Sequence, residues 1–176
     1  FPGIHPEWID GVIGIKALPG WLHGNVTSQI LRAVGGLFHR HKASNGEGGW
    51  WIATEISVQY LNTDRILQAD LAGWKRDQHS QPPDGFPVTV RPDWVCEVCH
   101  TTRKKDRELV PDTLSKAGVP YYWFVDAEEL CLEVWELQTD KSWKIIKILT
   151  EKNEEQIIQP FVTRTLSPKQ LLQKDW

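Results

Sequence analysis

The chain has 176 residues, of which 40% are hydrophobic and 24% are charged, and this fits one domain over residues 1–176 with a core of its own. A formal net charge of −3 excludes a uniformly basic nucleic-acid-binding protein, so contacts with nucleic acid would need a local basic patch. Three Cys favour a reducing compartment over a disulfide framework, and no apolar run reaches the roughly 18 residues of a membrane span. Because no secretory signal is visible either, we expect a cytoplasmic protein that contacts no membrane.

The first half of the chain predicts one helix and three strands. An amphipathic helix is expected between residues 19 and 41, where apolar residues recur at steps of three and four. After the turn SNGEGG, residues 52–60 alternate between apolar and polar side chains, as in a half-buried strand. A second strand is expected over 66–74 and a third over 88–99, with Pro92 near its start.

The second half predicts a helix followed by further strands. The helix covers 101–118, begins with a Thr, ends at Gly118 and contains Pro111, which would separate or kink its first turns. Strands follow at 120–126 and 130–137, with a hairpin partner at 142–149. A short helix begins at Ser167-Pro168. This order predicts an α/β fold around a mixed sheet.

The segment DWVCEVCH contains Cys96, Cys99 and His100 in the spacing of a c-type haem attachment site. In a strand, however, successive side chains point to opposite faces, so Cys96 and Cys99 would project to opposite sides of the sheet. They could not then hold one haem or zinc ion together without a break in the strand. A redox or zinc module that uses Cys96, Cys99 and His100 is therefore the weakest functional hypothesis for this sequence.

The same strand carries one acid, Glu97, among apolar residues, and burying an unpaired carboxylate costs several kcal/mol. It could simply be hydrogen-bonded at a strand end. Asp93 shares its face but lies about 13 Å away along a strand that rises about 3.3 Å per residue. Asp70 is better placed, because it would lie beside Glu97 if the second and third strands pair. The two carboxylates could then hold one hard divalent cation.

Three segments carry a family resemblance: ILQADLAGW, RPDWVCEVCHTTRKKD and KAGVPYYWFVDAEELCLEVWEL. Together with GGWWIATEISVQYL and WIDGVIGIKALPGWLHG, they resemble the Uma-two family of restriction endonuclease-like proteins, within the PD-(D/E)XK nuclease superfamily. The resemblance implies a restriction endonuclease-like core, with a mixed central sheet flanked by helices. It also implies hydrolysis of DNA phosphodiester bonds and a homodimer. Its Mg²⁺ (or Mn²⁺) ion would be held by Asp70, Glu97 and the backbone carbonyl of Cys99 or, alternatively, of Val98.

The sequence departs from the pattern of that family in its basic residues. The superfamily's Lys, two residues after the Glu, is Cys99 here, and the alternative position on the following helix is Val110. Lys104 and Lys105 are candidate catalytic replacements, although they also fit a solvated basic turn. A further departure is Ala69-Asp70 in place of Pro-Asp.

His23 and Glu55 are further candidates for lining the cleft, and each also fits an ordinary surface or hydrogen-bonded residue. Asp106 is expected to cap or ion-pair the helix that follows it, and the Trp-rich segments to pack in the core. The leading hypothesis is a metal-dependent endonuclease. The alternative is a catalytically degenerate protein of the same fold that binds nucleic acid or a protein partner without cleavage.

Overall fold

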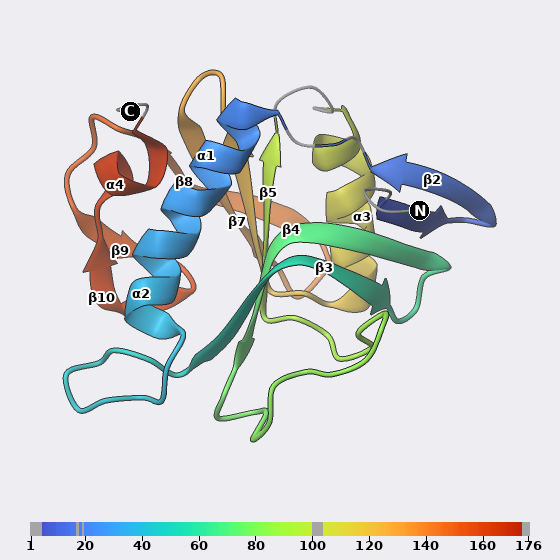
Figure 1. Cartoon of the computed structure of the whole chain (residues 1–176), viewed down its shortest axis with the longest axis horizontal. Helices are drawn as coiled ribbons and strands as arrows, with labels where there is room; N and C mark the ends of the chain where they lie inside the picture. Colours follow the sequence, from blue (N-terminus) through green and yellow to red (C-terminus); the bar gives the residue numbers. More distant parts are fainter. Residues whose placement is uncertain (1–4, 17, 19, 100–103, 174–176) are drawn as a thin grey trace.

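The computed structural model describes residues 5–16, 18, 20–99 and 104–173. A mixed eight-stranded sheet forms its centre, with strand order β2-β1-β4-β5-β6-β7-β8 and with β3 paired to β4 off this path (Figure 1). The strands of this sheet are β1 (His5–Ile9), β2 (Val12–Lys16), β3 (Trp50–Tyr60), β4 (Arg65–Lys75), β5 (Trp94–Cys99), β6 (Tyr121–Asp126), β7 (Cys131–Leu137) and β8 (Trp143–Thr150). The predicted α/β class with a mixed sheet is confirmed.

Helices and a small second sheet cover this central sheet. The helical segments are α1 (Trp21–Ile30), a π-helical stretch (Leu31–Gly35), α2 (Gly36–Phe38), a second π-helical stretch (Lys105–Leu109), α3 (Val110–Ala117) and α4 (Pro168–Leu172). The small sheet pairs β9 (Gln156–Ile158) with β10 (Phe161–Leu166). Ser167 caps α4 by accepting the amide hydrogen of Gln170, as the Ser-Pro start predicts. None of the described helices is long and apolar enough to cross a membrane.

Two hydrophobic clusters lie on opposite faces of the sheet. On one face, α1, the π-helical stretch that follows it and α2 bury Val26, Ile30, Val34 and Phe38, which are spaced four residues apart along one side of the helical segment. This cluster includes an aromatic group in which the ring centroids of Trp94 and Trp123 lie 5.1 Å apart. On the other face, α3 packs Val110 and Leu114 against the sheet. The Trp-rich segments therefore supply much of the core, as expected.

The connection from β5 to β6 is a crossover, because these two strands are parallel. Helix α3 makes this crossover and ends at Gly118, which adopts the left-handed conformation (φ 76°) typical of a C-terminal cap. The helix is preceded by a π-helical turn. Pro111 accounts for that turn, because its ring cannot follow the regular helical path next to the carbonyl four residues earlier. The predicted cap at Thr101 lies outside the described residues.

The structure differs from the sequence prediction at the start of one strand and in two small pairs of strands. The third predicted strand begins at Trp94 rather than at residue 88, and Val88 makes only an isolated parallel bridge with Val58. Pro92, which cannot donate a hydrogen bond to a ladder, lies in the irregular part. The hairpin of β1 and β2 and the small sheet of β9 and β10 were not predicted, since their strands are only three to six residues long.

Candidate active site

Asp70 and Glu97 lie on neighbouring strands, because β4 and β5 pair in an antiparallel register that sets Leu71 opposite Cys96. Both acids are buried, each with 4% of its surface exposed. The backbone amide of Val98 donates to Oδ2 of Asp70 at 2.7 Å, which ties the Asp70 side chain directly to β5. The structure thus brings the two acids together, as the strand pattern suggested.

Lys16 links the two carboxylates. Its Nζ donates to Oδ1 of Asp70 at 2.8 Å, to Oε2 of Glu97 at 2.9 Å and to the backbone oxygen of Gln68 at 2.7 Å. Sequence reasoning missed this residue. The available signal was Asp10-Gly11, a typical two-residue turn for a hairpin, and both residues have positive φ (49° and 89°). A hairpin at that turn sets His5 opposite Lys16, at the open end of the two strands.

Lys16 reaches the two acids where the pairing between β1 and β4 stops. Strand β1 pairs with β4 only at Trp8 and Ile9. Beyond that point, the carboxylate of Glu7 accepts the amide hydrogen of Gln68 at 3.2 Å, while Lys16 donates to the oxygen of the same residue. Side chains from the hairpin therefore satisfy both backbone groups of Gln68, so the buried strand loses no hydrogen bond where the ladder opens.

The environment separates the pKa values of the two acids. Burial opposes ionisation of Asp70, but the hydrogen bond from His23 and the charge of Lys16 outweigh it and lower the Asp70 pKa below its usual value. Burial raises the pKa of Glu97 well above its usual value, despite the attraction of Lys16, and repulsion from Asp70 and Asp106 adds to the rise. Asp70 is thus the firmly ionised member of the pair.

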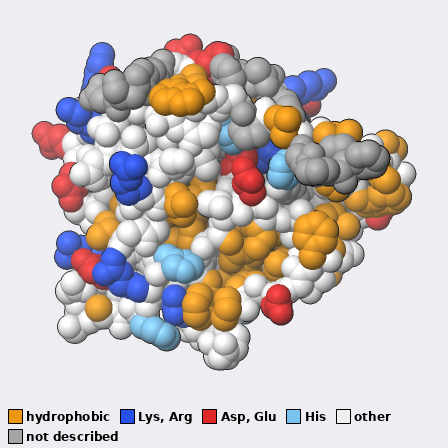
Figure 2. Space-filling model, in the orientation of Figure 1, with side chains coloured by type: hydrophobic (Ala, Val, Ile, Leu, Met, Phe, Trp, Pro, Cys, Tyr) orange, Lys and Arg blue, Asp and Glu red, His pale blue; other side chains and the backbone are white. Residues whose placement is uncertain are grey.

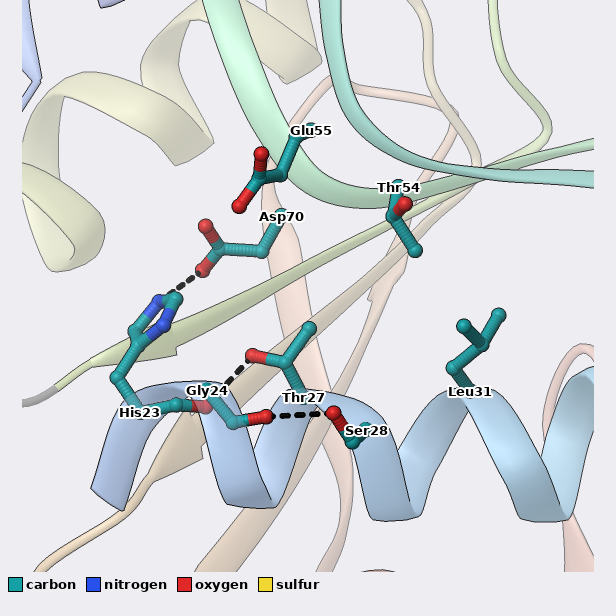
Figure 3. A pocket seen from close by; sticks show the side chains of 8 residues that line it. All are labelled: His23, Gly24, Thr27, Ser28, Leu31, Thr54, Glu55 and Asp70. Carbon is teal, nitrogen blue, oxygen red and sulfur yellow. Dashed lines mark hydrogen bonds and ion pairs between the residues drawn. The ribbon is translucent and has the colours of Figure 1, made fainter. Parts of the chain in front are cut away.

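A cavity of about 220 Å³ lies beside Asp70, between α1 and the strands β3 and β4 (Figure 3). His23, in the first turn of α1, projects into it, and its Nε2 lies 2.9 Å from Oδ2 of Asp70. Because an ionised carboxylate can only accept, Nε2 carries the hydrogen. The other ring nitrogen, Nδ1, is buried and has no hydrogen-bond partner among the described residues.

Glu55 lines the same cavity from β3. The pairs Thr54–Leu71 and Ile56–Ala69 set it opposite Asp70, and Figure 3 shows the two side chains next to each other. Its φ of 48° is rare for a residue inside a strand. Strained backbone of this kind is found disproportionately at functional sites.

The two predicted lysines lie differently from each other. Lys104 is exposed to solvent. The ammonium of Lys105 pairs with Glu7, the residue that also accepts the Gln68 amide hydrogen. Lys105 is therefore connected to the acid pair only indirectly, by a chain of contacts that runs through Glu7, Gln68 and Lys16.

The backbone carbonyls predicted as metal ligands point to different neighbours. The oxygen of Cys99 accepts the amide hydrogen of Ala127, on the β6 side of β5. The amide of Val98 points to Asp70 on the β4 side, and the amide and carbonyl of one strand residue share an edge. Of the two alternatives, Val98 is therefore the carbonyl on the side of the acids. Val110 is buried in the core, and Asp106 is buried near Glu97, in the first turn of the π-helical stretch before α3.

The cysteines do not form a joint site. Cys96 packs in the cluster under α1 and Cys99 in the cluster under α3, as the strand alternation predicts. Burial raises the pKa of the Cys96 thiol well above its usual value, which disfavours the thiolate that binds metals. His100 lies outside the described residues. Within the described part of the chain, no three His, Cys, Asp or Glu side chains gather as a metal site.

Comparison with known proteins identifies the family. No curated protein matches the sequence. The fold is similar to the crystal structure of a "putative nuclease belonging to DUF820" from Anabaena variabilis, with a TM-score of 0.69 and 17% sequence identity, over 95% of this chain and 89% of that chain. The model of the Uma2 family, described as "Putative restriction endonuclease", matches residues 1–168. The chain therefore belongs to the Uma2 family of restriction endonuclease-like proteins.

Proposed function

We propose that the chain is a metal-dependent endonuclease that hydrolyses DNA phosphodiester bonds at Asp70 and Glu97. One observation carries the proposal: two buried carboxylates from adjacent strands converge on a single cation, the ammonium of Lys16. A pair of acids that already binds one cation between them has the donor chemistry for a hard divalent ion. Membership of a restriction endonuclease-like family supports DNA as the substrate.

In this proposal Asp70 and Glu97 hold Mg²⁺ or Mn²⁺, and the carbonyl of Val98, on the β4 side of β5, is the candidate for a further ligand from the strand of Glu97. The bound ion would neutralise the scissile phosphate and lower the pKa of the attacking water. His23 would orient Asp70 by its hydrogen bond, as groups behind a metal ligand commonly do. Glu55 would line the path of the substrate into the cavity next to Asp70.

A second cavity supports contact with a phosphate backbone away from the acids. It measures about 400 Å³ and is lined by His41, Lys42, Lys75 and Arg76, among others. Figure 2 shows Lys, Arg and His side chains gathered at the lower left of the face that it presents. Because affinity for DNA depends largely on neutralising phosphates, such a local patch would compensate for the net charge of −3.

Cleavage of supercoiled plasmid by the purified chain with Mg²⁺ or Mn²⁺ tests this function. We expect cutting by the wild type, loss of cutting in both Asp70→Ala and Glu97→Ala, and no effect of Asp112→Asn. Asp112 is a matched acid on α3 that pairs with Arg65 rather than with the site. Cutting that persists in both site variants would sink the proposal.

The alternative is a degenerate member that binds nucleic acid or protein without cutting. One observation favours it: the ammonium of Lys16 already pairs with both acids, while the usual lysine positions hold Cys99 and Val110. A folded wild-type protein that binds DNA fragments but cuts none, with either metal, would identify this function.

A further inference from the structure

We infer that Lys16 is an exchangeable cation of the acid pair: its ammonium takes the position between Asp70 and Glu97 until a divalent ion displaces it. The inference rests on the proposed function, because it concerns the same two carboxylates. It adds a positioning residue from β2 and a coupling between metal loading and the N-terminal hairpin. Neither follows from the acid pair alone.

The contacts of Lys16 show why it must move. Its Nζ lies 2.8 Å from Asp70 and 2.9 Å from Glu97, so it occupies the point on which the two carboxylates converge. A divalent ion bound to the same oxygens would lie next to this ammonium. Juxtaposed like charges cost several kcal/mol, so both cations cannot share the two carboxylates in this arrangement.

The position of β2 at the edge of the sheet allows Lys16 to move away from the acids. Within the described residues, β2 pairs only with β1 and is the edge strand of the sheet. Its side chains Val12, Ile13 and Ile15 are exposed, and hydrophobic surface is visible at the right of Figure 2, where Figure 1 shows this hairpin. Within the part of the chain that the structure describes, these three side chains are therefore not buried against the rest of the protein.

The two ends of the hairpin are anchored differently. At the turn, Asp10 forms a two-pronged ion pair with Arg65, at 2.9 and 2.8 Å, and its amide donates to Asp64. At the open end, the contacts with β4 and β5 come from Lys16, from Glu7 and from His5, whose Nδ1 lies 2.7 Å from the side-chain amide of Gln68. A cation that replaces Lys16 thus removes the contacts of the β2 end of the hairpin with both acids, and leaves the turn and the contacts of β1 attached.

Two measurements on the full chain test the exchange. The first is calorimetric titration with Mn²⁺ of the wild type, Lys16→Met and Lys147→Met. Loss of the competing ammonium should tighten Mn²⁺ binding on the order of tenfold or more in Lys16→Met. Lys147→Met is the control, since it removes a part-buried ammonium on β8 that donates to Gln156 and not to the acid pair. It should bind Mn²⁺ as the wild type does.

The second measurement needs no variant, and so does not depend on whether Lys16→Met folds. Lysines of the wild type are acylated briefly with and without Mn²⁺, and modified peptides are quantified by mass spectrometry. We expect Lys16 to be protected without the metal and severalfold more reactive with it, while the exposed Lys104 is unchanged.

The outcomes separate this inference from the proposed function. Equal Mn²⁺ affinity in wild type and Lys16→Met, or Lys16 that stays protected when Mn²⁺ is bound, overturns the exchange even if plasmid is cut. Absence of Mn²⁺ binding in both proteins overturns it as well. Tighter binding in Lys16→Met together with a metal-induced rise in Lys16 reactivity supports the exchange, whether or not plasmid cleavage is observed.

Discussion

Nε2 of His23 lies 2.9 Å from Oδ2 of Asp70, and the same carboxylate oxygen accepts the amide hydrogen of Val98 at 2.7 Å. This one oxygen therefore joins α1, β4 and β5. The contact fixes how the Asp70 side chain is rotated, and it leaves Oδ1 directed to the cation. A helix that covers one face of the sheet thus helps to set the geometry of an acid at the edge of the cavity.

His23→Ala should lower Mn²⁺ affinity and plasmid cleavage by about 10- to 100-fold, the usual effect of removing a group that orients a metal ligand. Calorimetry and cleavage rates measure the two effects. Ser28→Ala is the control, because Ser28 lines the same cavity but donates only to the backbone oxygen of Gly24. Unchanged affinity and cleavage in a folded His23→Ala protein would show that the Val98 amide orients Asp70 without His23.

Asp70→Asn should destabilise the protein by about 3–5 kcal/mol at pH 7, because it removes one partner of a buried ion pair. The pKa of Asp70 is lowered in the folded state from an ordinary value of 3.8. The unfolded chain therefore takes up this proton more readily, so the stabilisation by Asp70 is complete above about pH 4 and declines as the pH falls further. The difference in free energy of unfolding between wild type and variant should shrink between pH 7 and pH 3.

Urea unfolding at several pH values measures this difference. Asp112→Asn is the control, since Lys116 and Arg65 also lower the Asp112 pKa but Asp112 itself is exposed, and its effect should stay near or below about 1 kcal/mol. If the difference in free energy of unfolding between wild type and Asp70→Asn stays constant or grows towards pH 3, the pKa of Asp70 is not lowered in the folded protein.

Gly73→Ala should destabilise the protein by about 1–3 kcal/mol through overpacking. A Cβ at this position of β4 would lie 3.1 Å from the ring of Trp94 and 3.2 Å from that of Trp50, and both rings are buried. Gly36→Ala, in α2, is the opposite case, because a Cβ there meets no atom of the described residues within 4 Å. It should stabilise by roughly 0.5–1 kcal/mol through lower backbone entropy in the unfolded chain.

Thermal and urea unfolding of the two variants compare these effects. If Gly73→Ala is as stable as the wild type, the two Trp rings must be able to move apart, and the core of this face would be less tightly packed than the ring contacts indicate.

The sequence was most informative where periodicity and burial act together. A lone acid in the apolar strand of Glu97 requires a partner, and the pairing of consecutive strands identified Asp70. Lys16 could not be found in this way, because its contacts join residues 54 and 81 positions apart. Only the hairpin turn at Asp10-Gly11 pointed to it, and a turn does not reveal what the open end of its hairpin contacts.

Glu55 shows a second limit of sequence patterns. The alternation over residues 52–60 correctly predicted a strand, but it gave no sign that one residue has a positive φ. Tertiary structure imposes that conformation against the preference of the residue. The positive φ of Glu55 can therefore be recognised only in a structure that includes the neighbouring strand β4, which carries Asp70.

Glu55→Gly should raise stability by about 1 kcal/mol and lower plasmid cleavage by about tenfold. Stability should rise because Gly adopts a φ of 48° without strain. Cleavage should fall because the carboxylate beside Asp70 is removed. Glu55→Gln keeps the strained backbone, so it should lower cleavage without the gain in stability. Lys141→Gly, at a φ of 69° in the turn between β7 and β8, should gain similar stability with no change in cleavage. Full cleavage by both Glu55 variants would instead make the strain at this residue a purely structural feature of the bend in β3.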